Sequence, residues 1–353
     1  MRIAPATWQD EVAFYDAARP FWYPIARSAD VTSGDLQAVE LLGEDLVVWR
    51  TPQGRVAVAD NLCAHRGTML STGKVSENGC ITCPYHGWEY DADGACTRIP
   101  QRPAQTPVPS NARIQAYPTR EHAGLIWTCL AGAEGAKADV PECPFYDDPE
   151  WFFHTGTPSE WECQTARMVE NFLDVAHFGI VHADTFGNPD VEIVEPYEVT
   201  VSADRLRIDA KVPYLARDPW AEPGPGERAA TVQTDYAYHC DLPFTAWIGG
   251  LTAGEDYMLY ISASPRSATE TTVFWTFGTP RSLAATPEEV EARENAVFSP
   301  DRFIVEGQRP EWLPLDLTAE LQMRFDALGV NFRRALEHHG FPRLVNLRRA
   351  QAR

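Results

Sequence analysis

Residues 63–88 read CAHRGTMLSTGKVSENGCITCPYHGW and contain two short segments that each offer one cysteine and one histidine. The first segment has one residue between Cys63 and His65, and the second has two residues between Cys83 and His86. Thiolate and imidazole side chains at such short spacing are typical of metal centres. These four side chains are therefore the first candidate metal site.

The mixed pairs match the ligand set of a Rieske [2Fe–2S] cluster, in which two thiolates bind one iron and two imidazoles bind the other. Cys63 and Cys83 would bind the first iron, and His65 and His86 the second. Zinc is the alternative, because it also binds Cys and His, and Cys80 forms a C-x-x-C pair with Cys83. Common zinc spacings pair like residues, however, so the mixed order favours the Rieske cluster.

Short strands surround this stretch. Residues 36–62 alternate in polarity and are rich in β-forming residues, and similar segments separated by turn residues continue to about residue 130. We therefore predict a small all-β domain over residues 20–135. The Pro- and acid-rich segment 138–151 then reads as a link, and residues 1–19 and 136–353 are expected to form a second domain.

The second half of the chain mixes strands with helices. Residues 193–278 have strand patterns, whereas residues 286–296 and 316–339 have the apolar spacing of helices. In the last segment the repeating positions are Leu317, Leu321, Phe325, Leu328, Phe332 and Leu336. The sequence predicts an α+β fold, with an all-β N-terminal domain followed by a sheet that has helices on one side.

Charge and composition exclude several classes of protein. The formal net charge of −20 disfavours binding to nucleic acid or to an anionic membrane surface. No apolar run reaches the roughly 18 residues of a membrane helix, and the N-terminus lacks the pattern of a secretory signal. The eight cysteines are scattered, which argues against a disulfide framework. We expect a soluble cytoplasmic protein.

A second candidate site lies in residues 170–182, which read ENFLDVAHFGIVH. Two histidines and one carboxylate can bind Fe(II) and leave positions open for O2 and substrate. His177 and His182 are separated by about 140° on a straight helix, so the helix must end or bend between them, and Gly179 offers a place. A Rieske cluster needs an electron acceptor, and a mononuclear iron held here would be one.

The chain resembles the oxygenase (alpha) component of the Rieske non-haem iron oxygenases, most of all the branch of vanillate O-demethylase and dicamba demethylase. The resemblance covers about residues 20–335. The stretches that carry it are PFWYPIARSADV, CAHRG, CPYHGWEYDADG, ENFLDVAHFGIVH and DRFIVEGQRPEWLPLD.

The resemblance implies roles for individual residues. His177 and His182 would bind the mononuclear Fe(II), with Asp301 as the third ligand. The residue before this aspartate is commonly acidic in members of the family, whereas here it is Pro300. Asn171 would lie beside the iron.

It also implies an assembly and the form of the second domain. Asp174 would connect His177 by hydrogen bonds to the cluster ligand His86 of a neighbouring subunit, in a head-to-tail homotrimer. The C-terminal domain would have the helix-grip form, with the substrate pocket between sheet and helix.

The two metal sites, the single chain of 353 residues and the resemblance together imply the expected reaction. The chain would be a monooxygenase that uses O2 to hydroxylate an aromatic or heterocyclic small molecule, or to remove an O- or N-methyl group from it. The alternatives are a ring cis-dihydroxylating dioxygenase, a Rieske electron-transfer protein without oxygen chemistry, and a zinc-binding module. No flavin or NAD fingerprint is present, so electrons would come from NAD(P)H through a separate reductase, with or without a ferredoxin.

The substrate pocket should draw on the strands within residues 239–250, 257–265 and 271–278. Their apolar side chains suit an aromatic ligand with a few polar groups. The candidates for the pocket wall are Leu242, Phe244, Trp247, Met258 and Trp275, with His239 as the polar one.

Overall fold

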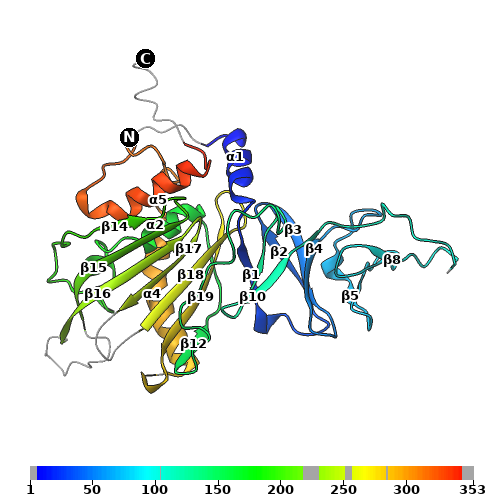
Figure 1. The fold of residues 1–353 in the computed structure, drawn as a ribbon, viewed down its shortest axis with the longest axis horizontal. Coiled ribbons are helices and arrows are strands. Elements are labelled where there is room, and N and C mark those ends of the chain that lie inside the picture. Colours follow the sequence, from blue (N-terminus) through cyan, green and yellow to red (C-terminus); the bar gives the residue numbers. More distant parts are fainter. Residues whose placement is uncertain (1–5, 104, 218–229, 251–256, 284, 344–353) are drawn as a thin grey trace, which may run out of the picture. The chain divides into compact units, whose positions relative to one another are not determined.

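The computed structural model describes residues 6–103, 105–217, 230–250, 257–283 and 285–343 (Figure 1). The chain divides into two compact units. The small unit is Arg19–Glu142, and the large unit combines Met1–Ala18 with Cys143–Arg353. The predicted α+β class, with an all-β unit and a unit of sheet and helices, is confirmed.

The small unit consists of short antiparallel strands in three sheets. The first has the order β1 (Tyr23–Arg27), β11 (Leu125–Thr128), β10 (Thr119–His122). The second has the order β2 (Leu36–Leu41), β3 (Glu44–Arg50), β4 (Val56–Asp60), β9 (Ala116–Tyr117). The third has the order β5 (Lys74–Val75), β6 (Ile81–Thr82), β7 (Glu89–Tyr90), β8 (Cys96–Arg98).

One apolar core holds the second and third sheets together and fixes the two Cys/His segments. Trp49 is fully buried, and its indole N–H donates to the Gly79 carbonyl at 3.1 Å. Ile81 and Tyr90 belong to the same cluster, together with Cys63 and Cys83. The two cysteines are thus anchored in the core, while the loops that follow them reach the surface of the unit.

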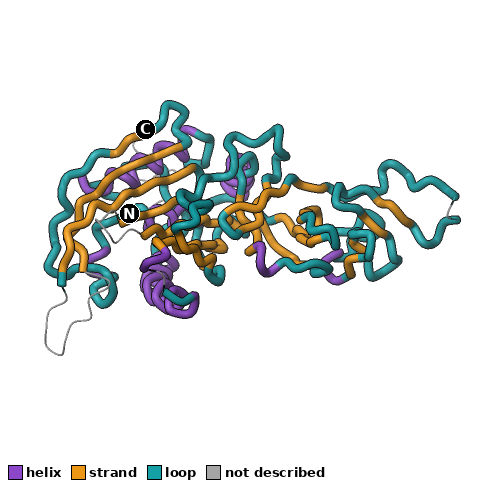
Figure 2. The backbone as a smooth tube through the Cα atoms, turned by 60° about the horizontal axis from the view of Figure 1, so that its bottom comes forward, coloured by secondary structure: helices purple, strands orange, loops and turns teal. Residues whose placement is uncertain are grey.

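The large unit is built on one antiparallel sheet (Figures 1 and 2). Its strands are β12 (Trp151–Thr155), β13 (Ser159–Trp161), β14 (Val199–Val201), β15 (Arg207–Arg217), β16 (Thr231–Asp241), β17 (Thr245–Gly250), β18 (Tyr257–Pro265) and β19 (Thr271–Pro280). The spatial order is β12-β19-β18-β17-β16-β15-β14, and β13 also pairs with β19.

Helices pack on this sheet. The helices of the large unit are α1 (Trp8–Ala18), α2 (Thr165–Phe172), α3 (Phe178–Val181), α4 (Pro287–Glu306) and α5 (Ala327–His338), with 3-10 turns at Arg281–Leu283 and Arg324–Asp326. The small unit has 3-10 turns at Ser28–Asp30 and Leu70–Thr72. Helix α2 contacts β17, β18 and α4, whereas α5 contacts β14 and β15. None of the helices within the described ranges is long and apolar enough to cross a membrane.

Helix α4 is longer than the sequence predicts. The Thr286 hydroxyl accepts from the Glu289 N–H in a capping box, and Pro287 follows in the first turn, as in many helix starts. The helix was predicted to end at residue 296, but it continues through Pro300 to Glu306. Its buried positions Val290, Glu294, Phe298, Asp301 and Val305 form one face, and this face carries a candidate iron ligand toward the core.

The prediction of a helix over 316–339 is wrong in its first part. Helix α5 covers only Ala327–His338, and residues 316–323 are irregular. The Asp316 carboxylate accepts from the backbone N–H of Thr318 at 3.0 Å, an interaction that competes with helix formation. Leu321 is 87% exposed, so its apolar spacing does not reflect a buried face.

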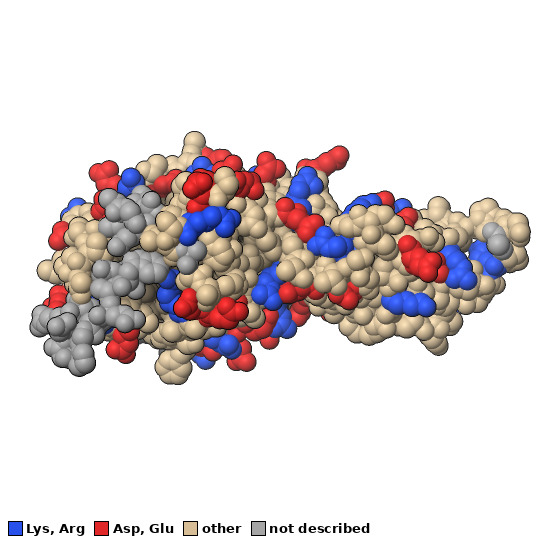
Figure 3. Space-filling view, turned by 90° about the horizontal axis from the view of Figure 1, so that it is seen from below, with Lys and Arg blue, Asp and Glu red and all other residues tan. Residues whose placement is uncertain are grey.

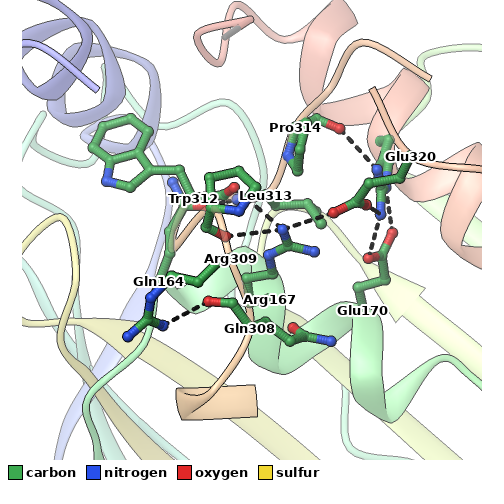
Figure 4. A network of polar contacts seen from close by, with 11 residues as sticks. Gln164, Arg167, Glu170, Gln308, Arg309, Trp312, Leu313, Pro314 and Glu320 are labelled. Carbon is green, nitrogen blue, oxygen red and sulfur yellow. Dashed lines mark hydrogen bonds and ion pairs between the residues drawn. The ribbon is translucent and has the colours of Figure 1, made fainter. Parts of the chain in front are cut away.

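A buried network of charged side chains ties α2 to α5 (Figure 4). The Arg333 guanidinium, 3% exposed, pairs with both carboxylate oxygens of Glu170 and with Glu320, and it donates to the Pro314 carbonyl at 2.9 Å. Arg167 donates to the other oxygen of Glu320 at 2.8 Å. The network therefore fixes the helix that leads into the second candidate metal site.

Replacing Arg333 by methionine is expected to lower the free energy of unfolding by roughly 3–5 kcal/mol, because Glu170 would stay buried without its partner. Burial already raises the pKa of Glu170 with Arg333 in place. Urea unfolding followed by circular dichroism measures the loss. Arg334→Met is the control, since Arg334 is exposed and should cost less than about 0.5 kcal/mol. Equal stability of the two variants would contradict a structural role for the network.

Charged groups of both signs are mixed on the surface. On the face shown in Figure 3, acidic and basic side chains alternate, and the described residues there form no continuous basic patch. Exposed pairs such as Arg55–Asp93 and Arg98–Glu89 neutralise part of the basic charge locally.

Candidate metal centres and the adjoining pocket

Residues 63–68 and 83–88 form two loops with the same backbone hydrogen bonds. In each loop the cysteine N–H donates to the carbonyl five residues later, and the cysteine carbonyl accepts from a glycine N–H four residues later, at 2.8–3.0 Å. These glycines, Gly67 and Gly87, have φ of 68° and 71°, which glycine adopts without strain. The sequence thus builds two matching loops that present one cysteine and one histidine each.

The four side chains converge as the sequence predicts. The imidazole rings of His65 and His86 have centroids 4.6 Å apart, and the thiols of Cys63 and Cys83 are close enough to hydrogen bond. Nδ1 of His65 is buried and has no hydrogen-bond partner among the described residues. Two thiols beside two imidazoles, one with an unused ring nitrogen, fit a cluster with the Rieske ligand set. Cys80 is not part of this group, since its sulfur lies 3.6 Å from the Thr97 hydroxyl.

The environment of Cys83 disfavours its thiolate form. Burial raises the pKa of Cys83, and hydrogen bonds from backbone N–H groups oppose that effect only in part. The thiolate is the form of cysteine that binds metal. Bound iron would therefore have to offset the free-energy cost of a negative charge on the buried sulfur. The hydroxyl of Tyr90 lies 3.2 Å from the Cys63 sulfur, where it can donate to a thiolate.

In the large unit, one short helical turn sets the two histidines of the second site. Helix α2 ends at Phe172, and α3 covers only Phe178–Val181, with His177 and His182 flanking it. The chain does not bend at Gly179, contrary to the sequence-based expectation. A Cβ there would lie 2.8 Å from the Asn188 carbonyl oxygen, so the glycine allows close packing of α3 against that segment.

His177, His182 and Asp301 bring three donor atoms to one point. Nε2 of His182 lies 3.2 Å from Nε2 of His177 and 3.2 Å from Oδ1 of Asp301. Nε2 of His177 lies 3.6 Å from the same oxygen. Oδ1 of Asp301 is buried without a hydrogen-bond partner among the described residues. Two imidazoles and one carboxylate, converging in this way, fit the facial ligand set of mononuclear Fe(II).

Asp174 orients the first of these histidines. Its Oδ2 lies 3.1 Å from Nδ1 of His177, and its Oδ1 accepts from the Ala176 N–H at 2.9 Å. A proton held on Nδ1 leaves Nε2 of His177 free as a metal ligand. The Asp174 side chain remains 34% exposed, so it is accessible from outside the unit. Asn171 lies on the wall of the adjoining cavity.

A cavity of about 290 Å³ opens beside the three converging side chains. Most of its wall is apolar, and the polar groups are few. Such a cavity suits a small ring compound. The residues that define its shape are Phe178, Tyr236, Ile248, Leu259, Phe277 and Phe298.

The sequence predicted part of the strands that line this cavity, but it missed β15 and the first half of β16, and it named the wrong side chains. Ile248, Leu259 and Phe277 line it, whereas the predicted Trp247 and Met258 lie one position away on β17 and β18. Because side chains alternate along a strand, this shift places them on the opposite face of the sheet. The predicted Leu242, Phe244 and Trp275 are buried but do not line the cavity either.

His239 also lies on that opposite face, directly across from Trp247 in the β16–β17 pair. Its ring nitrogens lie 2.6 Å from Asp209 and 3.0 Å from Asp241. Burial disfavours its protonation, but hydrogen bonds and charges from Asp241 and Asp209 outweigh this and raise the pKa of His239. The residue therefore belongs to an ion pair outside the pocket.

The sequence reasoning missed three charged residues of the cavity wall, Arg217, Arg293 and Glu294. Glu294 is 4% exposed, and burial raises its pKa. The signal was available, since Glu294 precedes Asp301 by two helical turns and so shares its face of α4.

Comparison with known proteins agrees with this geometry. Residues 21–118 match the family of the Rieske [2Fe-2S] domain, and residues 161–339 match the vanillate O-demethylase oxygenase C-terminal domain. Methylxanthine N1-demethylase NdmA of Pseudomonas putida is 30% identical over 328 residues, covering 90% of this chain and 88% of that protein. These matches define an oxygenase with two metal-binding domains.

Solved structures extend the likeness. The structure of Pseudomonas putida CBB5 NdmA with caffeine superposes with a TM-score of 0.78 at 26% identity, covering 92% of each chain. A structure of dicamba monooxygenase with non-haem iron and dicamba has a TM-score of 0.72 at 20% identity, covering 92% of this chain and 97% of that one, and supports the fold.

The chain belongs to the Rieske non-haem iron oxygenases, with a C-terminal domain of the vanillate O-demethylase type. The predictions of an oxidoreductase of the monooxygenase or demethylase kind, with a Rieske [2Fe–2S] cluster and a mononuclear iron as cofactors, are confirmed. The alternatives of a zinc-binding module and of an electron-transfer protein without oxygen chemistry are excluded, because the C-terminal domain is that of an oxygenase.

Proposed function

We propose that this oxygenase removes an O- or N-methyl group from an aromatic or heterocyclic small molecule by hydroxylating the methyl carbon. The observation that carries this proposal is the convergence of His177, His182 and Asp301 at the end of a mostly apolar cavity. The relatives are consistent with it, since NdmA is a methylxanthine demethylase and was solved with caffeine.

The proposed reaction consumes two electrons for each methyl group removed. O2, two electrons and two protons convert the methyl group to a hydroxymethyl group and one water, and the hydroxymethyl compound then releases formaldehyde. We assign the Rieske cluster to Cys63, His65, Cys83 and His86, and the mononuclear iron to His177, His182 and Asp301. The cluster supplies an electron, and the iron supplies O2 activation. We further propose that electrons come from NAD(P)H through a separate ferredoxin or flavin reductase.

The chain's own residues place the substrate and exclude water. The aromatic wall formed by Phe178, Phe277 and Phe298 can hold a planar ring, and Asn171 can contact the reacting end of the ring beside the iron ligands. A ring that fills this largely apolar cavity keeps bulk water away from the reacting carbon.

We propose that Asp174 links the two metal centres of neighbouring subunits in a head-to-tail homotrimer. Its exposed carboxylate can accept from the imidazole of a partner subunit's cluster ligand, at the position of His86, while it holds Nδ1 of His177. Exposed apolar side chains support an interface at both ends of this contact. Leu321 lies in the same surface depression as Asp174, and Tyr85, next to His86, is 64% exposed.

Peroxide-driven turnover tests the proposed reaction. The protein is loaded with iron, reduced, and given peroxide in place of O2 and the donor, together with pooled methoxy- and N-methyl-aromatics or their unmethylated parents. We expect formaldehyde from at least one methylated pool and none from the parents. Products that gain one or two oxygen atoms without formaldehyde would instead indicate ring hydroxylation or dihydroxylation, and would contradict demethylation.

Tyr90→Phe is expected to lower the reduction potential of the cluster by on the order of 50 mV. The Tyr90 hydroxyl lies 3.2 Å from the Cys63 sulfur, and a hydrogen bond to a cluster thiolate favours the more negative, reduced state. A reductive titration followed by visible absorbance measures the shift. Tyr85→Phe is the matched control, because Tyr85 is exposed and makes no such contact. Equal potentials in the two variants would contradict the proposed hydrogen bond.

A further inference from the structure

A buried carboxylate faces the cavity at a distance from the iron ligands. Glu294 lines the cavity and is 4% exposed. The guanidinium of Arg293 donates through Nε to Oε1 at 3.0 Å, and its Nη2 forms an ion pair with the same oxygen at 3.0 Å. The other oxygen, Oε2, accepts no hydrogen bond from the part of the chain that the structure describes. A buried carboxylate with an unused acceptor in a ligand cavity is costly unless a ligand satisfies it.

The surroundings of this carboxylate are aromatic. The Arg293 guanidinium lies over the ring of Phe277, 4.2 Å from its centroid. Tyr236 and Tyr257 interact with each other on the same cavity wall. The wall therefore presents an acceptor, Glu294, next to a donor group, Arg293. The cavity is also lined by the polar side chains of Asn171, Thr185, Arg217 and Thr234.

The helix fixes how far this polar pair lies from the iron ligands. Glu294 and Asp301 are seven residues apart on one face of α4, which corresponds to about 10 Å along the helix axis. A ring system held at the polar pair can thus extend across the cavity to His177, His182 and Asp301. The distance suits a substituted ring whose polar edge and methyl group lie on opposite sides.

We propose that the substrate is a neutral ring compound whose polar edge carries an N–H donor beside a C=O acceptor, as in a lactam or a carboxamide. The N–H donates to Glu294 and the C=O accepts from Arg293. A carboxylate at this edge of the ring is disfavoured, because its charge would meet that of Glu294, and Arg293 already pairs with Glu294. This inference rests on the proposed function only in placing a methyl group at the iron ligands. The binding of the N–H and C=O groups at Glu294 and Arg293 does not depend on the reaction.

Equilibrium binding to the oxidised holoenzyme at pH 8, without a reductant, tests the inference independently of turnover. The probes share one ring and two methoxy groups: 3,4-dimethoxybenzamide, 3,4-dimethoxybenzoate and N,N-dimethyl-3,4-dimethoxybenzamide. Theobromine, with a ring N–H between two carbonyls, and caffeine, in which that N–H is methylated, form a second pair. We expect the N–H member to bind at least tenfold more tightly than its charged or N-methylated counterpart, by isothermal titration calorimetry.

Glu294→Gln is expected to reduce the preference for the amide over the acid to less than threefold, because the glutamine neither repels a carboxylate nor accepts as strongly. Glu288→Gln is the matched control, since Glu288 is exposed on the first turn of α4, and it should keep the preference. The inference is overturned if the acid binds as tightly as the amide, if no N–H probe binds, or if Glu294→Gln leaves the preference unchanged. If the amide binds more tightly than the acid as expected, but turnover releases no formaldehyde, only the proposed demethylation is contradicted.

Discussion

Asp174→Asn is expected to reduce reductase-driven turnover on the order of 100-fold while both metal centres remain occupied. The carboxylate of Asp174 lies 3.1 Å from Nδ1 of His177 and is exposed enough to reach a second imidazole. The amide keeps the shape of the side chain but loses the charge that holds two N–H donors at once. Electron transfer between the centres should therefore fail before metal binding does.

Two measurements separate this explanation from simple damage to the site. Iron and acid-labile sulfide should match the unmodified protein, and peroxide-driven formaldehyde release should persist, since peroxide brings both the oxygen and the electrons. Asp184→Asn is the control, because Asp184 is an exposed aspartate close to the same histidines in sequence. Unchanged reductase-driven turnover in Asp174→Asn would sink the proposed link between the metal centres.

Asp301→Ala is expected to abolish turnover with either oxidant, through loss of the mononuclear iron. Oδ1 of Asp301 is the only carboxylate oxygen among the described residues that converges with Nε2 of His177 and of His182. Two histidines alone hold Fe(II) weakly. Iron should fall from about three atoms per chain to about two, while the absorbance and sulfide content of the cluster stay constant.

The control for this variant is Glu288→Ala, which removes an exposed carboxylate from the same helix. It should keep the full iron content and turnover. If Asp301→Ala retained three iron atoms per chain, the assignment of the third ligand would be wrong, and another carboxylate near the histidines would have to replace it.

The sequence was most informative where ligands are close together along the chain. Cys63, His65, Cys83 and His86 lie in two short loops, so their spacing alone specified a site that the fold then assembles. Asp301 lies far along the chain from the histidines, and only the family resemblance pointed to it. Residue spacing cannot show that α4 carries this carboxylate back to α3, because the contact depends on how the helices pack on the sheet.

The cavity wall could not be predicted at the level of single residues for a related reason. Nearly every residue of β18 and β19 is buried on both faces of the sheet, so the polar–apolar alternation that identifies a face is absent. An error of one position then exchanges the two faces, as happened with Trp247 and Met258. The prediction of a helix over 316–323 failed because Leu321, which is exposed, fitted the apolar spacing of an amphipathic helix.

A single-turnover experiment tests most directly the central claim, that both metal centres act together on a methylated ring compound. The protein is fully reduced, freed of reductant, and exposed to O2 with or without a substrate drawn from the active pool. The account predicts that the cluster is oxidised rapidly only when substrate is present, and that formaldehyde forms in proportion to the cluster oxidised. Rapid oxidation of the cluster that does not depend on substrate, with no formaldehyde, would contradict it.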